Sequence, residues 1–185
     1  MSLITDLGQV AGTLLVLGEL GKAASLAEDI LDVGRSHGLR APDHPETRYS
    51  NALALETKAE IERARGELQS AREGFRAAAD ILELLSREKD SMKYRYWLVR
   101  ALRSLGEIEL RAGERERAAA TFDRGLSVAR ELVAILPSPE HLDTLVKMLL
   151  LAQREEEAAP IIDRLAAMGY QSRPYLDFLA RHGMG

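Results

Sequence analysis

One row of charged and aromatic side chains has the types and the spacing needed to bind an anionic partner. Its members follow one another at intervals of three or four residues, so a helix would place them all on one face; they are Lys93, Tyr96, Arg100, Arg103, Glu107 and Arg111. Four of the six are cationic, and an arginine guanidinium can hold a carboxylate through two parallel hydrogen bonds. In a groove, this row would bind an acidic peptide or a C-terminal carboxylate. The alternative is a solvated helix face rich in charge.

The residues that usually carry catalysis or hold metals form no recognisable motif. The histidines stand in four separate places, and none belongs to a metal-binding pattern such as H-E-x-x-H; they are His37, His44, His141 and His182. The sequence also lacks a phosphate-binding G-x-x-x-x-G-K-[ST] loop and a G-x-S-x-G nucleophile turn. Acidic residues are abundant, but no pair stands out. We therefore expect no enzyme, no cofactor and no metal site.

Composition narrows the remaining classes. The chain has 185 residues, of which 46% are hydrophobic and 29% charged, which is typical of a folded soluble protein. Its net charge of -4 disfavours a general nucleic-acid binder. No apolar run is long enough to span a membrane, and the absence of cysteine favours a reducing compartment. We expect a cytoplasmic protein that binds neither nucleic acid nor membrane.

The pattern of apolar residues that would form the helix carrying these six side chains recurs along the chain. Small and large apolar residues keep their order in four windows, and Ala71 and Phe75 recur 47 residues later as Ala118 and Phe122. Within a window the apolar residues advance by three or four, which is the helical period, and repeats of this length usually stack into a solenoid. Antiparallel helices approach closely only at small residues, so we expect Gly106 to lie against Phe122.

Glycine and proline mark the ends of the expected helices. Gly66 and Gly113 fall where the first helix of a pair must end and turn, and Pro42 and Pro45 separate the first window from the second. The expected helices run over residues 2–17, 21–36, 44–65, 67–88, 91–112, 114–136, 139–152, 156–168 and 173–182.

The third window also carries a family pattern. It has Leu102-x₂-Leu105-Gly106-x₂-Glu109, followed by Ala118-x₃-Phe122. This resembles the tetratricopeptide repeat, whose pattern is W-x₂-L-G-x₂-Y and then A-x₃-F. Glu109 stands where the family has Tyr, and the spacing of 47 residues exceeds the family's usual period of about 34. The chain therefore looks like the long-helix repeat arrays of bacterial proteins.

The resemblance implies an all-α fold over a single domain, residues 1–185. It would be a right-handed superhelix of about four antiparallel helical hairpins, over 2–38, 44–88, 91–136 and 139–168, closed by a C-terminal capping helix over 173–182. In that cap the apolar side chains would fold over the end of the array; they are Tyr175, Leu176, Phe178 and Leu179.

Proteins of this family bind partner proteins or peptides on a concave face lined by the first helix of each pair. The resemblance thus implies a protein–protein interaction module, with the row from Lys93 to Arg111 on its concave face. Two alternatives stay open. One is a homo-oligomerisation or structural segment of a larger bacterial signalling protein, forming a homodimer through apolar N-terminal helices. The other is a regulatory domain of the same family that senses a ligand.

Overall fold

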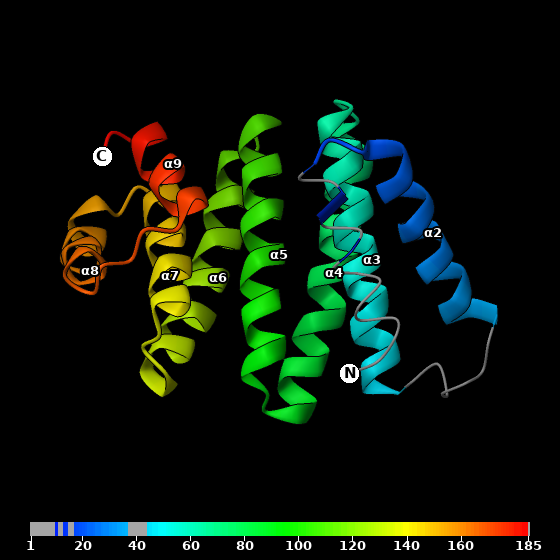
Figure 1. Ribbon diagram of the computed structural model, residues 1–185, viewed down its shortest axis with the longest axis horizontal. Coiled ribbons are helices and arrows are strands. Elements are labelled where there is room, and N and C mark those ends of the chain that lie inside the picture. The colour runs from blue at the N-terminus through cyan, green and yellow to red at the C-terminus, as the bar shows by residue number, and fades with distance from the viewer. Residues whose placement is uncertain (1–9, 11–12, 15–16, 37–43, 185) are drawn as a thin grey trace.

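The described part of the chain is entirely helical. The computed structural model describes residues 10, 13–14, 17–36 and 44–184, in which there are eight labelled α-helices and no strand (Figure 1). The helices are α2 (Leu20–Ser36), α3 (Pro45–Ala64), α4 (Leu68–Lys89), α5 (Met92–Arg111), α6 (Arg115–Ile135), α7 (Pro139–Leu151), α8 (Glu155–Ala167) and α9 (Arg173–Arg181). Each begins and ends within one residue of a helix expected from the sequence. The helix expected over 2–17, and with it a dimer through that helix, lies outside the described residues.

From α2 to α8 the helices stand side by side in chain order, and α9 lies beside α7 (Figure 1). Successive helices from α2 to α8 pack against one another, and α5 also touches α7. The helices α3, α5 and α7 alternate with α4 and α6 along the array, so α3, α5 and α7 form one layer of it. We call the surface made by α3, α5 and α7 the odd-helix face. Helix α9 adds its buried side chains to the apolar cluster around α7.

Turns with a left-handed residue follow α3, α5 and α7. Gly66 and Gly113 follow α3 and α5 with φ of 81° and 79°, a conformation that glycine adopts without the steric cost of a Cβ. Gln153 occupies the corresponding turn after α7 with φ of 58°. Connections this short force neighbouring helices to run in opposite directions, as Figure 1 shows. The turns predicted at Gly66 and Gly113 are confirmed.

A close helix–helix contact explains the glycine in the third window. A Cβ added at Gly106 would lie within 2.8 Å of ring carbons of Phe122, which is closer than real Cβ atoms approach. The same arrangement recurs between α3 and α4, where a Cβ on Gly74 would lie 2.9 Å from the Cβ of Ala59. Phe75 and Phe122 are both almost fully buried. The expected packing of Phe122 against Gly106 is confirmed.

Helix α9 packs against α7 near the C-terminal end of the helical array (Figure 1). Tyr175, Phe178 and Leu179 are buried in one cluster with α7 residues such as Leu142. Leu176 was expected to join them but is 46% exposed, because its position on the short helix faces away from that cluster.

No helix in the described ranges combines the length and the apolarity needed to cross a bilayer.

Candidate functional site

Helix α5 carries all six side chains of the row, but their surroundings divide them into two groups. The N-terminal half, Lys93, Tyr96 and Arg100, contacts α3 and a cluster of aromatic rings. The C-terminal half, Arg103, Glu107 and Arg111, lines a pocket. The two halves therefore differ in how far their charge is already neutralised.

Polar contacts join α3 to α5 along most of their length. They pair Lys93 with Glu46 (3.2 Å), Arg100 with Glu56 (3.9 Å), Ser104 with Glu60 (3.3 Å) and Glu107 with Arg63 (3.2 Å). Each pair brings opposite charges or a donor and an acceptor together. The cations Lys93 and Arg100 are therefore matched by carboxylates of α3.

Aromatic rings surround this first group. The Lys93 ammonium lies 3.9 Å from the centre of the Tyr49 ring, and the Arg100 guanidinium lies 4.3 Å from the centre of the Trp97 ring. Both are cation–π distances. Tyr96 packs edge-on against Trp97 at 6.0 Å and lies 6.0 Å from His141 of α7. These contacts hold the N-terminal half of α5 in place.

The second group opens onto a pocket between the odd-numbered helices and α9. The pocket has a volume of about 470 Å³. Five permanent cations and one carboxylate line it; they are Arg63 of α3, Arg103, Glu107 and Arg111 of α5, Lys147 of α7 and Arg181 of α9. Its other walls are Leu110, Leu151, Pro174, Phe178 and His182. We call this the α5–α7–α9 pocket.

The cations of the pocket outnumber their carboxylate partners. Arg63 is bound to Glu60, Lys147 lies 2.7 Å from Asp143, and Arg103 lies 3.6 Å from Glu107. The last distance is too long for a hydrogen bond, and Arg103 Nε has no hydrogen-bond partner among the residues that the structure describes. Arg111 and Arg181 form no ion pair with any described residue. Arg181 instead donates from Nε to the backbone oxygen of Asp177 at 3.2 Å.

Positive charge around Lys147 affects its proton affinity. Burial lowers the pKa of the Lys147 ammonium, and the guanidinium groups of Arg103 and Arg100 lower it further, while Asp143 acts in the opposite direction. The like charges of α5 and α7 therefore repel one another across the pocket. An anion placed between them would remove this repulsion.

A second hollow of similar size shows that an excess of positive charge is not a general feature of the helical array. It lies between α4, α5 and α6, with a volume of about 450 Å³. Three arginines and three acids line it; they are Arg87, Arg95, Arg124, Glu83, Asp90 and Glu131. Arg124 pairs with Glu83 at 2.7 Å, and Arg95 with Glu131 at 3.5 Å. Its charges balance, so it offers no comparable attraction for an anion.

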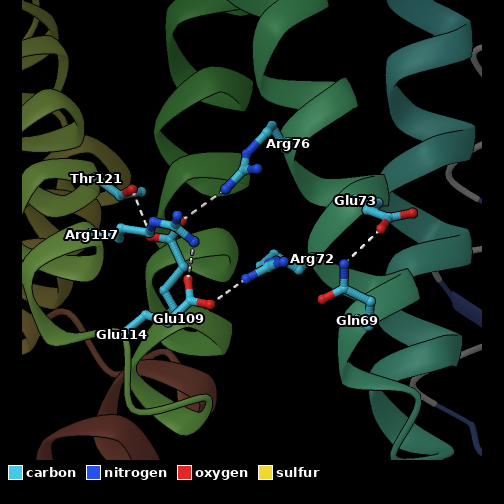
Figure 2. A network of polar contacts seen from close by, with 8 residues as sticks. All are labelled: Gln69, Arg72, Glu73, Arg76, Glu109, Glu114, Arg117 and Thr121. Carbon is cyan, nitrogen blue, oxygen red and sulfur yellow. Dashed lines mark hydrogen bonds and ion pairs between the residues drawn. The ribbon is translucent and has the colours of Figure 1, made fainter.

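A polar network joins α4, α5 and α6 near the turn after α5 (Figure 2). Glu109 is only 2% exposed and accepts hydrogen bonds from the Thr121 hydroxyl at 2.7 Å and from Arg76 at 3.2 Å. Glu114 in the same network is bound by Arg72 and Arg117. These hydrogen bonds satisfy the carboxylates of Glu109 and Glu114, so the network stabilises the packing of the three helices.

The histidines of the described residues make local structural contacts. His44 Nδ1 accepts from the Glu46 amide at 3.2 Å and caps α3, and His182 stacks on Phe178 with ring centres 4.1 Å apart. His141 contacts the backbone oxygen of Leu136 at 2.7 Å. His37 lies outside the described residues. Within those residues no three metal-ligating side chains come close enough to hold an ion.

Sequence reasoning located half of the pocket and missed the rest. The spacing pattern on α5 predicted Arg103, Glu107 and Arg111 as site residues. It did not predict Lys147 of α7 or Arg181 of α9. A signal for Lys147 was present in the repeat. Glu60 and Glu107 are 47 residues apart, and the offset of 40 to the fourth window leads from Glu107 to Lys147. The charge thus changes sign at this position in α7. No comparable signal pointed to Arg181, because α9 stands after the repeats.

Comparison with known proteins adds no family assignment. No model of a protein family matches the chain, and no curated protein is found to be similar to it.

Proposed function

We propose that this chain is a tetratricopeptide-like interaction module that binds an acidic segment of a partner protein on the odd-helix face. The observation that carries the proposal is the α5–α7–α9 pocket. It gathers five permanent cations against one lining carboxylate in a chain whose net charge is -4. Local charge of one sign in a concave, partly apolar site attracts a ligand of the other sign.

The helical architecture supports the same proposal. Long helices in a row, with left-handed glycines at Gly66 and Gly113 and the Gly106–Phe122 contact, are in keeping with the repeat family that the sequence resembles. In such arrays the alternate helices offer an extended surface for a partner. The proposal needs binding alone and no catalytic step. The absence of cysteine agrees with our proposal of a cytoplasmic location.

The size and walls of the pocket suit a peptide side chain or a short peptide segment. Ligand sites commonly measure roughly 300–1,000 Å³, and this pocket has about 470 Å³. Leu110, Leu151 and Phe178 supply apolar contact area, while Arg103 and Arg111 supply guanidinium groups that can each bind a carboxylate through two hydrogen bonds. An acidic segment with an apolar residue would use both kinds of wall.

A capture experiment with matched variants tests the proposal. The binding variant carries Arg100→Gln, Arg103→Gln and Arg111→Gln, which removes three positive charges from α5. The control carries Arg65→Gln, Arg115→Gln and Arg164→Gln, which removes three exposed arginines elsewhere. Both must keep the wild-type circular dichroism spectrum. We expect a partner in the lysate of the source organism that wild type and control capture and the binding variant loses. A partner that all three retain would contradict the proposed face.

Trp97 then provides a direct readout. It is the only tryptophan in the chain, and Arg100 lies over its ring. Titration of an acidic peptide from the captured partner should change its fluorescence, with an affinity that falls as salt is added because salt screens the charges. Binding that is insensitive to salt would oppose an electrostatic site.

A further inference from the structure

We propose that the α5–α7–α9 pocket recognises an aryl phosphomonoester, as in a phosphotyrosine side chain of the partner segment. This inference rests on the proposed function, because it names the group that the partner presents to the pocket. Three observations support it: the number of unmatched cations, their type, and the apolar walls beside them.

The first observation is the size of the charge excess. Glu60, Asp143 and Glu107 neutralise Arg63, Lys147 and Arg103, respectively. Arg111 and Arg181 remain without a carboxylate partner among the described residues, which leaves two positive charges. A phosphomonoester carries about -1.5 to -2 at pH 7, whereas a carboxylate carries a single charge. A phosphoryl group therefore matches the excess, and one carboxylate would leave part of it unmatched.

The second observation is that the pocket is closed by guanidinium groups from different helices. Arg103 and Arg111 come from α5 and Arg181 comes from α9, with Lys147 of α7 between them in the lining. Guanidinium groups bind phosphate oxygens through pairs of parallel hydrogen bonds, and arginine clusters are a common means of recognising phosphorylated peptides. Within the described part of the chain, the Arg103 Nε–H donates to no hydrogen bond. Glu107 opposes an anion, and its pairing with Arg63 at 3.2 Å reduces that effect.

The third observation is the apolar wall. Leu110, Leu151, Pro174 and Phe178 share the lining with the cations. Leu110 is 41% exposed, so its side chain is open to contact from a ligand in the pocket. A phenyl ring attached to the phosphoryl group would cover this surface and would gain contact area that a bare phosphate cannot provide. The combination favours an aryl phosphate over inorganic phosphate.

The test compares ligands that differ in one property at a time, by isothermal titration calorimetry with the full chain. Phenyl phosphate has the ring and the double charge, benzenesulfonate has the ring and a single charge, and inorganic phosphate lacks the ring. We expect phenyl phosphate to bind at least about 10-fold more tightly than either of the others. Equal affinity for benzenesulfonate would overturn the charge argument, and equal affinity for inorganic phosphate would overturn the role of the apolar wall.

Peptides distinguish a partner's side chain from a free small molecule. A five-residue peptide with phosphotyrosine between glutamates should bind more tightly than both its unphosphorylated twin and phenyl phosphate. A phosphopeptide that binds no more tightly than phenyl phosphate would overturn the assignment to a partner's side chain. If the unphosphorylated twin binds as tightly as the phosphopeptide, an acidic-peptide function stands and the phosphoryl inference falls. If phenyl phosphate binds but neither peptide does, it is the proposed function that fails.

Arginine variants test whether the phosphopeptide binds in the α5–α7–α9 pocket. Arg111→Gln with Arg181→Gln removes the two unmatched cations, both exposed, so the fold should be retained. We expect the Kd of the phosphopeptide to rise at least about 10-fold. The control, Arg65→Gln with Arg164→Gln, should change it less than about twofold. An unchanged Kd in the Arg111/Arg181 variant would overturn the assignment to this pocket.

Discussion

At the scale of single residues, buried carboxylates explain the main departure from the repeat pattern. Glu109 stands where the tetratricopeptide repeat, which the sequence resembles, has a tyrosine. It is buried and accepts hydrogen bonds from Arg76 and Thr121 (Figure 2). A buried charge is tolerated only when other groups pair with it and hydrogen-bond to it. Arg76 of α4 and Thr121 of α6 meet this requirement, so a position that looked like a weak match links three helices.

Glu56 is a second buried carboxylate, and it is less well compensated. It is 6% exposed, and its nearest cation, Arg100, lies 3.9 Å away. Burial raises the pKa of Glu56, while Arg100 and Arg103 act in the opposite direction. The folded state therefore holds this proton more tightly than the unfolded chain, in which a glutamate titrates near about 4.3. The resulting stability is present below that pH and is lost as the pH rises through the raised pKa of the folded state.

We predict that Glu56→Gln stabilises the protein at pH 8 and not at pH 4. Glutamine removes the cost of burying the charge, which wild type bears only when Glu56 is ionised. Thermal melts should show a higher Tm at pH 8, by about 2–4 °C for each kcal/mol gained in a chain of this size. The control Glu155→Gln changes an exposed glutamate of α8 and should give no rise. A rise for Glu56→Gln that is equal at both pH values would contradict the burial argument.

At the scale of helices, close contacts at small residues set the spacing between neighbours. Gly106 of α5 accepts the ring of Phe122 from α6 where any side chain would clash. A glycine inside a helix normally costs about 0.5–1 kcal/mol relative to alanine. The close approach that it permits offsets this cost through the burial of the ring.

We predict opposite effects for the same substitution at two glycines. Gly106→Ala should lower the free energy of unfolding by about 1–3 kcal/mol, because the new methyl group collides with Phe122 in a packed core. Gly21→Ala should raise it by about 0.5–1 kcal/mol, because Gly21 lies in α2 with nothing within 4 Å of an added Cβ. Urea unfolding of both variants measures the difference. Stabilisation by Gly106→Ala would rule out the close contact.

At the scale of the whole molecule, contacts pass mainly between successive helices. From α2 to α8, each helix packs on its neighbours in the chain, and the cluster containing α9 includes residues of α5 to α8 but none of α3 or α4. In an array whose helices contact mainly their neighbours, a local loss of contacts destabilises mainly the adjacent helices. One end can therefore open while the other stays folded.

We predict that Phe178→Ala loosens the C-terminal end alone. Loss of a buried phenyl ring costs about 3–5 kcal/mol, and hydrogen exchange should quicken in α7, α8 and α9 while α3 and α4 keep their protection. Leu176→Ala on the same helix is the control, because Leu176 is exposed and its loss should change little. Faster hydrogen exchange in α3 after Phe178→Ala would show that the helices open together as one unit.

Helix positions and turns were accessible from the sequence because they depend on local patterns. The three-and-four spacing of apolar residues placed the helices from α2 to α9, and glycines marked the turns at Gly66 and Gly113. Even the Gly106–Phe122 contact followed from repeated small and large residues. Each of these rests on a short stretch of chain, or on one stretch compared with its own repeat.

The pocket depended on the tertiary structure, because its charge balance arises between helices far apart in the chain. Four of the six side chains on α5 are cationic, yet Glu46 and Glu56 of α3 match the two in its first half. The second half faces Lys147 of α7 and Arg181 of α9, more than 35 residues further along the chain. Charges act through space, and only the packing of α3, α7 and α9 around α5 decided which cations are matched and which line an open pocket.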